Sequence, residues 1–441
     1  MSSIRRRRVT REERASRGGD EPRMPREILT VSFIGFVVTL GFGVIGPSLP
    51  ALGIEFGAGT TLMSLAISGF AVARLVTNLG FTVFLGGVRL RTVLWVGLMF
   101  QAVCSVVAAA ATDYTGFIVF RSLSGAGSAA FTIASSALLL ALAPSHARGR
   151  AMSVFAGATA LGTVSGPAVG GLFAVLDPRL PLLVYGGALT VASLAALVLL
   201  RSARDVTASP AVVAPESALA GGEAHRGSAA RVSGLFGVLA TDRLFAAAVM
   251  CQVVGGWVFY GMRTTTVPLQ LVGIGYAVGL IGLLLSAGAV AQLIGSGAAG
   301  ALSDRTGRVL PLVAALAVAA AGLALLGATG EVTVVLVAFV LLGLAGGAVA
   351  SVGTALLGDS PFGRSGRGVG IFWVASDIAA IAGPLVSGLV AERAGFGAAY
   401  AVAIAIVLCA LAVVARARRA DGWSRRRGGL EPGAPGRPEL G

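Results

Sequence analysis

The chain has 441 residues, of which 56% are hydrophobic and 12% charged, and its formal net charge is +14. A composition this apolar excludes an ordinary soluble enzyme and indicates a protein whose main solvent is lipid. The 34 basic residues are all arginines, and the sequence has no metal-ligand cluster, phosphate-binding loop or nucleophile with an adjacent base. We therefore predict neither an enzyme nor a cofactor or metal site.

Twelve apolar runs are long enough to cross a bilayer, since a spanning helix needs about 20 residues. The predicted spans are, in chain order, 28–50, 62–85, 92–111, 115–142, 149–175, 182–200, 244–271, 277–300, 310–329, 332–357, 368–391 and 397–415. This pattern predicts an all-α polytopic membrane protein with twelve transmembrane helices in two six-helix bundles, 28–200 and 244–415.

Polar segments precede, join and follow the two bundles. We predict a basic cytoplasmic tail at 1–27, a flexible cytoplasmic linker at 201–243 and a basic, disordered tail at 416–441. Within the linker, Leu235–Leu239 is expected to form a short amphipathic helix.

The distribution of arginines predicts the orientation. They gather in the tails and in the even-numbered loops, whereas the opposite loops hold only Arg179 and Arg393. Cytoplasmic loops carry the excess of basic residues, so both termini are expected on the cytoplasmic side of the plasma membrane. Because no aromatic residues interleave with the basic ones, we expect contact with anionic lipid and no nucleic-acid partner.

Two stretches about half the chain apart repeat one another. Residues 150–171 and 367–388 both begin with an arginine, continue as an apolar run and place a Gly-Pro pair within the span, at Gly166-Pro167 and at Gly383-Pro384. Neighbouring helices in a membrane can satisfy the carbonyl that a proline leaves free, so we predict two equivalent bent helices. Their glycines serve either close packing or transport. Parallel repeats of this kind build large secondary transporters.

Polar residues interrupt the predicted spans of the first half. Pro47 and Pro50 are expected to bend or stop the first helix at its outer end. Arg74 lies near the middle of the second span, where an arginine costs about 2.5–3.5 kcal/mol, so it needs a partner or water. In the fourth span, one face carries Arg121, Ser124, Ser128, Thr132 and Ser135. Such a polar stripe lines a cavity or hydrogen-bonds to a neighbouring helix.

The seventh span carries a second polar pattern. Its members are expected to share one face, because they recur at intervals of three or four residues: Gln252, Gly256, Tyr260 and Arg263. Trp257 lies beside them, as a packing residue or as a contact for a ligand.

Asp377, in the eleventh span, is the one acidic residue that we place deep in the membrane. It occupies the position that Ala160 holds in the first copy of the repeat. A lone acid in a span is a functional candidate, above all for proton relay.

These motifs resemble those of the major facilitator superfamily, and more narrowly its drug:proton antiporters, over residues 28–415. The segment 300–308, expected to be a charged turn, matches the loop signature G-x-L-x-D-R-x-G-R, with latch residues Gly300, Asp304, Arg305, Gly307 and Arg308. Residues 121–127 resemble the R-x-x-x-G signature of the fourth helix. The antiporter signature of the fifth helix is matched by Gly162, Gly166, Pro167, Gly170 and Gly171. In the first-half loop, Phe84 occupies the acidic position of the family, so that latch is expected to be incomplete.

The resemblance implies a central cavity lined by the first, fourth, seventh and tenth helices, and an interface between the second and eleventh. We accordingly expect Arg74 and Asp377 to form an ion pair between the bundles, which protonation of Asp377 would loosen. The expected cavity residues are Arg121, Ser124, Ser128, Gln252, Trp257, Tyr260 and Arg263, with Arg121 as a second candidate for proton coupling.

The favoured function is proton-coupled efflux of small organic molecules by a monomeric secondary transporter that works by alternating access. Three membrane arginines against one aspartate favour neutral or anionic substrates. An uptake symporter or facilitator in the same fold is the main alternative. A membrane sensor or scaffold that transports nothing is a further one.

Overall fold

The computed structural model describes residues 26–84, 88–143, 148–200, 206–207 and 232–428. The described residues are almost entirely helical, and one isolated bridge joins Arg89 to Thr207. Twelve helices are long and apolar enough to cross a membrane, and they follow the order of the twelve predicted spans. The predicted tail at 1–27 and the linker lie mostly outside the described residues, although a short helix covers the site expected near Leu235–Leu239.

The first half contains six long helices: α2 (Arg26–Glu55), α3 (Thr60–Phe84), α4 (Leu90–Ala110), α5 (Tyr114–Leu142), α6 (Arg148–Leu176) and α7 (Leu180–Leu199). The second half contains α8 (Val232–Thr241), α9 (Arg243–Val254), η4 (Gly255–Met262), α10 (Thr266–Gly273), α11 (Val278–Thr306), α12 (Val309–Ala328), α13 (Val332–Asp359), α14 (Gly366–Ala394) and α15 (Phe396–Gly428). Polar caps fix several starts: Asp113 accepts from the N–H of Gly116, and Ser365 accepts from that of Gly368.

Three helix ends differ from the sequence expectation. The prolines Pro47 and Pro50 lie inside α2 and do not stop it, because neighbouring helices can compensate for a proline in a membrane span. Helix α11 continues to Thr306, so the expected charged turn is largely helical, and the chain turns only at Gly307, with φ +89°. Helix α15 continues to Gly428 because alanine and arginine favour helix, which shortens the tail expected from 416.

The seventh span is the fourth difference. It is divided into α9, a π-helical segment (η4) and α10, whereas the sequence pattern predicts one regular helix. A π-helix has more residues per turn than an α-helix, so intervals of three or four residues no longer align the side chains of this segment.

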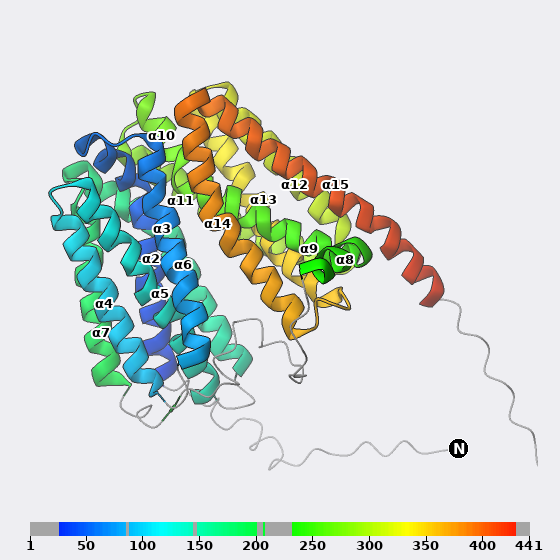
Figure 1. Ribbon diagram of the computed structural model, residues 1–441, viewed down its shortest axis with the longest axis horizontal. Helices are drawn as coiled ribbons and strands as arrows, with labels where there is room; N and C mark the ends of the chain where they lie inside the picture. Colours follow the sequence, from blue (N-terminus) through cyan, green and yellow to red (C-terminus); the bar gives the residue numbers. More distant parts are fainter. Residues whose placement is uncertain (1–25, 85–87, 144–147, 201–205, 208–231, 429–441) are drawn as a thin grey trace, which may run out of the picture.

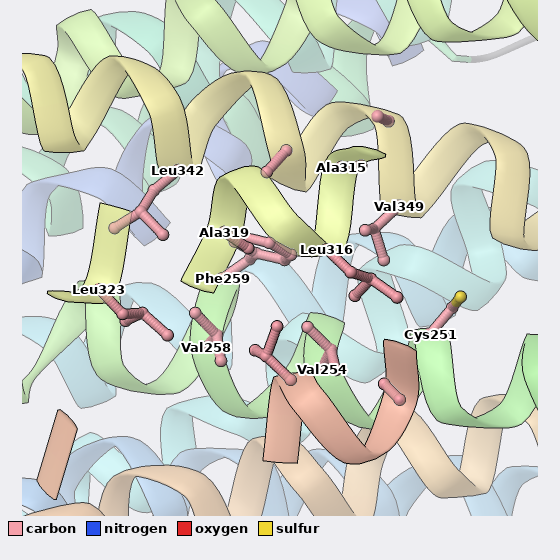
Figure 2. Packing of buried hydrophobic residues seen from close by; sticks show 14 of the residues in the cluster. Cys251, Val254, Val258, Phe259, Ala315, Leu316, Ala319, Leu323, Leu342 and Val349 are labelled. Carbon is pink, nitrogen blue, oxygen red and sulfur yellow. The ribbon is translucent and has the colours of Figure 1, made fainter. Parts of the chain in front are cut away.

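The helices form two bundles (Figure 1), one of α2–α7 and one of α9–α15. Each bundle has its own apolar core. Figure 2 shows part of the second core, in which Val258 and Phe259 of η4 lie among residues of α12 and α13 such as Leu316 and Leu342. The π-helical segment is therefore anchored on one side by apolar burial.

The two bundles meet at one end of the molecule, which we call the closed end and where α2 ends and α3 begins. They diverge toward the opposite end, the linker end, where α7 ends and α8 begins (Figure 1). Helix α6 packs against α11, α3 packs against α14, and α10 contacts α2 and α3. In the described residues, the hydrogen bonds between bundles join these same helices.

Candidate functional site

The two copies of the sequence repeat form the helices α6 and α14, each 29 residues long with a proline inside. Each copy packs across the molecule, α6 against α11 and α14 against α3. Two hydrogen bonds cross these interfaces from within the repeat copies and their partners, besides the one at the start of α3 described below. The N–H of Ala168 donates to Oγ of Ser286 at 3.0 Å, and Oγ of Ser68 donates to the carbonyl of Ile381 at 2.7 Å.

The antiporter-like glycines of α6 are packing residues in this structure. A Cβ atom on Gly162, Gly166 or Gly170 would lie 2.3–2.4 Å from a backbone carbonyl oxygen of α2. Gly171 instead faces α11, where its Cβ would lie 3.1 Å from Cα of Gly282. Pro167 lies between these contacts, and its carbonyl oxygen faces Gly282. The motif therefore lets α6 approach both α2 and the opposite bundle closely.

Arg121 is a buried charge in the first bundle, with 7% of its surface exposed. Its guanidinium carbon lies 4.3 Å from the ring centre of Phe70, and Nη1 donates to Oγ of Ser124 at 2.9 Å. Its Nε has no hydrogen-bond partner, and no carboxylate of the described residues forms an ion pair with it. A cation held by an aromatic face and a hydroxyl keeps its charge available for another group.

Tyr260 is a residue of the second bundle that lies near this charge. It lies on η4 within the range of electrostatic interaction of Arg121, Arg74 and Asp377. We call these four residues the central polar cluster. It draws on α3 and α5 from one bundle and on η4 and α14 from the other.

Asp377 and Arg74 are neighbours without direct contact. Both side chains are half-buried, and Asp377 lies within the electrostatic range of Arg74. Among the described residues, no nitrogen and oxygen of this pair lie within 4.0 Å. The expected ion pair therefore stays a prediction for a closer approach of α3 and α14.

The polar stripe of α5 is bonded within its own helix. Oγ of Ser124 donates to the carbonyl of Arg121, and Oγ1 of Thr132 donates to that of Ser128. Oγ of Ser128 is buried without a partner, and Ser135 donates to the carbonyl of Thr132. The described residues thus show no hydrogen bond from this stripe to another helix. Such bonding was one of the two explanations that the sequence left open, and cavity lining was the other.

The polar residues of the seventh span point in different directions, because η4 changes the helical period. Gly256 packs against α14, where its Cβ would lie 2.5 Å from the carbonyl of Ser376. Nη1 of Arg263 donates to Oε1 of Gln292 on α11 at 2.7 Å. Gln252 is half-buried on α9, before the π-helical segment. The expectation of one shared face is wrong.

Trp257 packs closely against Gly383 of α14, whose Cβ would lie 2.8 Å from its Cα. Its indole Nε1 is buried and has no hydrogen-bond partner among the described residues. A buried indole donor of this kind normally finds an acceptor, so Trp257 retains the capacity to donate to a ligand.

The latch motif lies inside the second bundle. Arg308 donates from Nη1 to Oδ1 of Asp304 at 2.6 Å and from Nε to Oδ2 of Asp359 at 3.1 Å, which joins α11 to the end of α13. The hydrogen bond to Asp304 raises the pKa of the Arg308 guanidinium most, and the hydrogen bond to Asp359 raises it further. Arg305 is exposed, and a Cβ on Gly300 would meet open space. The corresponding loop of the first half includes the Phe84 side chain and residues 85–87, which lie outside the described residues.

Three contacts were not anticipated from the sequence, and the first two lie at the closed end. Glu392 of α14 accepts from the N–H of Thr61 at 2.8 Å, at the start of α3 in the other bundle. Arg179 forms an ion pair with Glu55 at 2.6 Å and donates to two backbone carbonyls at the C-terminal end of α4. Gln292, the partner of Arg263, had a visible signal, since it is a polar residue within an apolar run.

Among the residues that the structure describes, no group of three or more histidine, cysteine, aspartate or glutamate side chains could hold a metal ion. The three cysteines are free, and Cys104 and Cys251 are buried.

A family model described as the Major Facilitator Superfamily matches residues 31–279 and 254–433. An uncharacterized MFS-type transporter of Methanocaldococcus jannaschii is 20% identical over 395 residues, which cover 87% of this chain and 98% of that protein. The quinolone resistance protein NorA of Staphylococcus aureus is 20% identical over 186 residues, 42% of this chain and 48% of NorA.

Two solved structures share the fold. A bacterial homolog of the human lysosomal transporter Spinster, in an inward-facing and unoccupied conformation, superposes with a TM-score of 0.71 at 14% identity, over 91% of this chain and 98% of the other. The nucleoside transporter NupG superposes with a TM-score of 0.67 at 12% identity, over 88% and 99%.

Proposed function

We propose that this chain, which belongs to the Major Facilitator Superfamily and is a multi-pass membrane transporter, exports small neutral or anionic organic molecules in exchange for protons. The observation that carries the proposal is the central polar cluster. In this cluster one carboxylate, Asp377 of α14, lies within electrostatic range of Arg74, which belongs to α3 of the other bundle.

The proposed proton step uses Asp377 as the carrier. Ionised, the carboxylate is attracted to Arg74, which draws α14 toward α3. Protonated, it loses its charge and with it this attraction. Because the two side chains lie on different bundles, the change in charge favours one arrangement of the bundles over another. Arg121 can modulate this step through Tyr260, which lies within electrostatic range of Arg121, Arg74 and Asp377.

The arrangement of the bundles supports alternating access. Contacts between them lie toward the closed end, and the ribbons of the two bundles diverge toward the linker end (Figure 1). If the arginine-rich face is cytoplasmic, as the positive-inside rule predicts, this is an inward-facing conformation of a plasma-membrane protein with both termini inside. A monomer suffices for this mechanism, since both bundles belong to one chain.

The charges of the cluster favour neutral or anionic substrates. The cluster holds two arginines, Arg74 and Arg121, and a single acid, and Arg121 has no carboxylate partner among the described residues. A cationic drug would meet net repulsion in such a site. Trp257 and Ser128 each offer a buried, unpaired polar group that a neutral substrate could use.

Export is favoured over uptake by two features. The glycines of α6 match the antiporter signature, and NorA, a quinolone resistance protein, aligns over part of the chain. Uptake is the second candidate, because the fold is also that of a transporter of other substrates, the nucleoside transporter NupG, and a fold alone sets no direction of transport. The direction of transport is decided by experiment.

The test measures proton movement in everted vesicles that carry the wild type, Asp377→Asn or the control Asp177→Asn, which removes an exposed carboxylate between α6 and α7. Neutral, anionic and cationic compounds are added to an established pH gradient. We expect collapse of the gradient by a neutral or anionic compound in the wild type and the control, and none in Asp377→Asn. A full response of Asp377→Asn would contradict the proposal, and accumulation of the compound by intact cells would establish uptake.

A further inference from the structure

A groove of about 590 Å³ lies at the linker end, between α8, α9 and α15. Two of the helices that line it, α8 and α15, lie on the side of the second bundle away from the first bundle (Figure 1), and none of the residues of the central polar cluster lines it. Its walls are apolar and include Leu239 of α8, Val249 and Met250 of α9, and Val413 of α15. Its volume falls within the usual range for small-molecule sites.

Two arginines, Arg243 and Arg416, line the same groove. Both side chains are exposed, and neither has a hydrogen bond or an ion pair with any described residue. The adjacent carboxylate of Asp242 is already engaged. It accepts from the N–H of Phe245 and from Ser360, which are contacts that begin α9 and hold the loop after α13. The groove therefore carries two positive charges that the described protein does not compensate.

We propose that this groove binds an anionic phospholipid, with the phosphodiester between Arg243 and Arg416 and an acyl chain along Met250 and Val413. Guanidinium groups bind phosphate oxygens through paired hydrogen bonds. Basic pockets between membrane helices on the cytoplasmic side are typical sites for anionic headgroups. Two simpler ligands would complement only part of the groove. Inorganic phosphate would leave the apolar walls uncovered, and a zwitterionic lipid would leave the net positive charge uncompensated.

Occupancy would tie α8 to α9 and α15. Helix α8 forms the C-terminal end of the linker between the bundles, so a lipid here would hold that end against the second bundle. The expected consequence is a greater thermal stability of the protein with anionic lipid than with zwitterionic lipid.

The test uses the purified full-length protein in detergent and follows its thermal unfolding. Three probes are titrated: phosphatidylglycerol, phosphatidylcholine with the same acyl chains, and water-soluble glycerol phosphate. The variants are Arg243→Gln/Arg416→Gln, Met250→Trp to fill the apolar wall, and the control Arg364→Gln, which removes an exposed arginine of the loop after α13.

We expect phosphatidylglycerol to raise the unfolding temperature of the wild type and of Arg364→Gln at lower concentration than phosphatidylcholine does. The double arginine variant should bind it about 30-fold more weakly, the effect of two surface arginines near anionic lipid. Met250→Trp should weaken binding while both arginines remain. Equal effects of the two lipids, an equal loss in Arg364→Gln, or the full effect from glycerol phosphate would each overturn the proposal.

Discussion

The contact between α6 and α11 allows the closed end to be opened by one substitution, Gly282→Val. A Cβ at this position would lie 2.4 Å from the carbonyl oxygen of Pro167 and 3.0 Å from Cα of Gly171. Both are backbone atoms, so no side chain can rotate away and the helices must separate. Overpacking of this kind costs about 1–3 kcal/mol. This cost applies only in the conformation in which the bundles touch. A cost of about 2 kcal/mol therefore shifts the conformational equilibrium roughly 30-fold toward the conformation in which the bundles are separated at this end.

The assay labels a cysteine at Ser68, a buried position whose hydroxyl bonds to Ile381 across the interface between α3 and α14. The exposed Cys409 is first changed to serine. We expect Gly282→Val to speed the reaction of Ser68→Cys with a membrane-impermeant maleimide. The matched control is Gly297→Val on the same helix, where a Cβ meets nothing within 4 Å. Equal labelling rates in the two variants would refute the claim that this contact holds the closed end shut.

Three further predictions follow from single contacts. Arg74→Ala should lower proton-coupled transport at least about tenfold while leaving the protein folded, because Asp377 loses the nearest opposite charge; a proton flux equal to that of the wild type would remove Arg74 from the mechanism. Arg308→Ala should lower thermal stability by about 1 kcal/mol, because its two carboxylate partners are largely exposed; an unchanged unfolding temperature would show that the latch contributes nothing in this state. Glu331 accepts from the N–H of Val334, which lowers the pKa of its carboxyl, so its stabilising effect is present above the ordinary value of about 4.3 and is lost as the pH falls through the lowered pKa. Unfolding of Glu331→Gln should therefore depend less on pH between about 5 and 3 than that of the wild type, and identical profiles would exclude the effect.

Hydropathy predicted the twelve spans in order, because length and apolar composition decide which segments enter lipid. The internal repeat predicted that α6 and α14 are equivalent, and both lie at an interface between the bundles. Both features can be read from the sequence without knowledge of which helices pack together. Sequence reasoning was weaker where a helix ends, as at α11, since charged residues at the membrane surface continue a helix as readily as they form a loop.

The geometry of the site required the structure. Phe70, which lies against Arg121, is one aromatic residue within an apolar run and carries no signal of that contact. The spacing of polar residues did not indicate the π-helical segment η4. Because of this segment, Gly256 and Arg263 lie on different faces of the seventh span. Glu392 lies near the end of a span, where its hydrogen bond to Thr61 depends on how the two bundles pack.

The most direct test of the central claim compares two transport modes in proteoliposomes that contain wild-type protein or Asp377→Asn. One mode is substrate movement driven by a pH gradient, and the other is exchange of labelled for unlabelled substrate without a gradient. If Asp377 carries the proton, the variant loses gradient-driven transport and retains exchange, because the bundles can still alternate around bound substrate. Gradient-driven transport by Asp377→Asn at the wild-type rate would contradict the account.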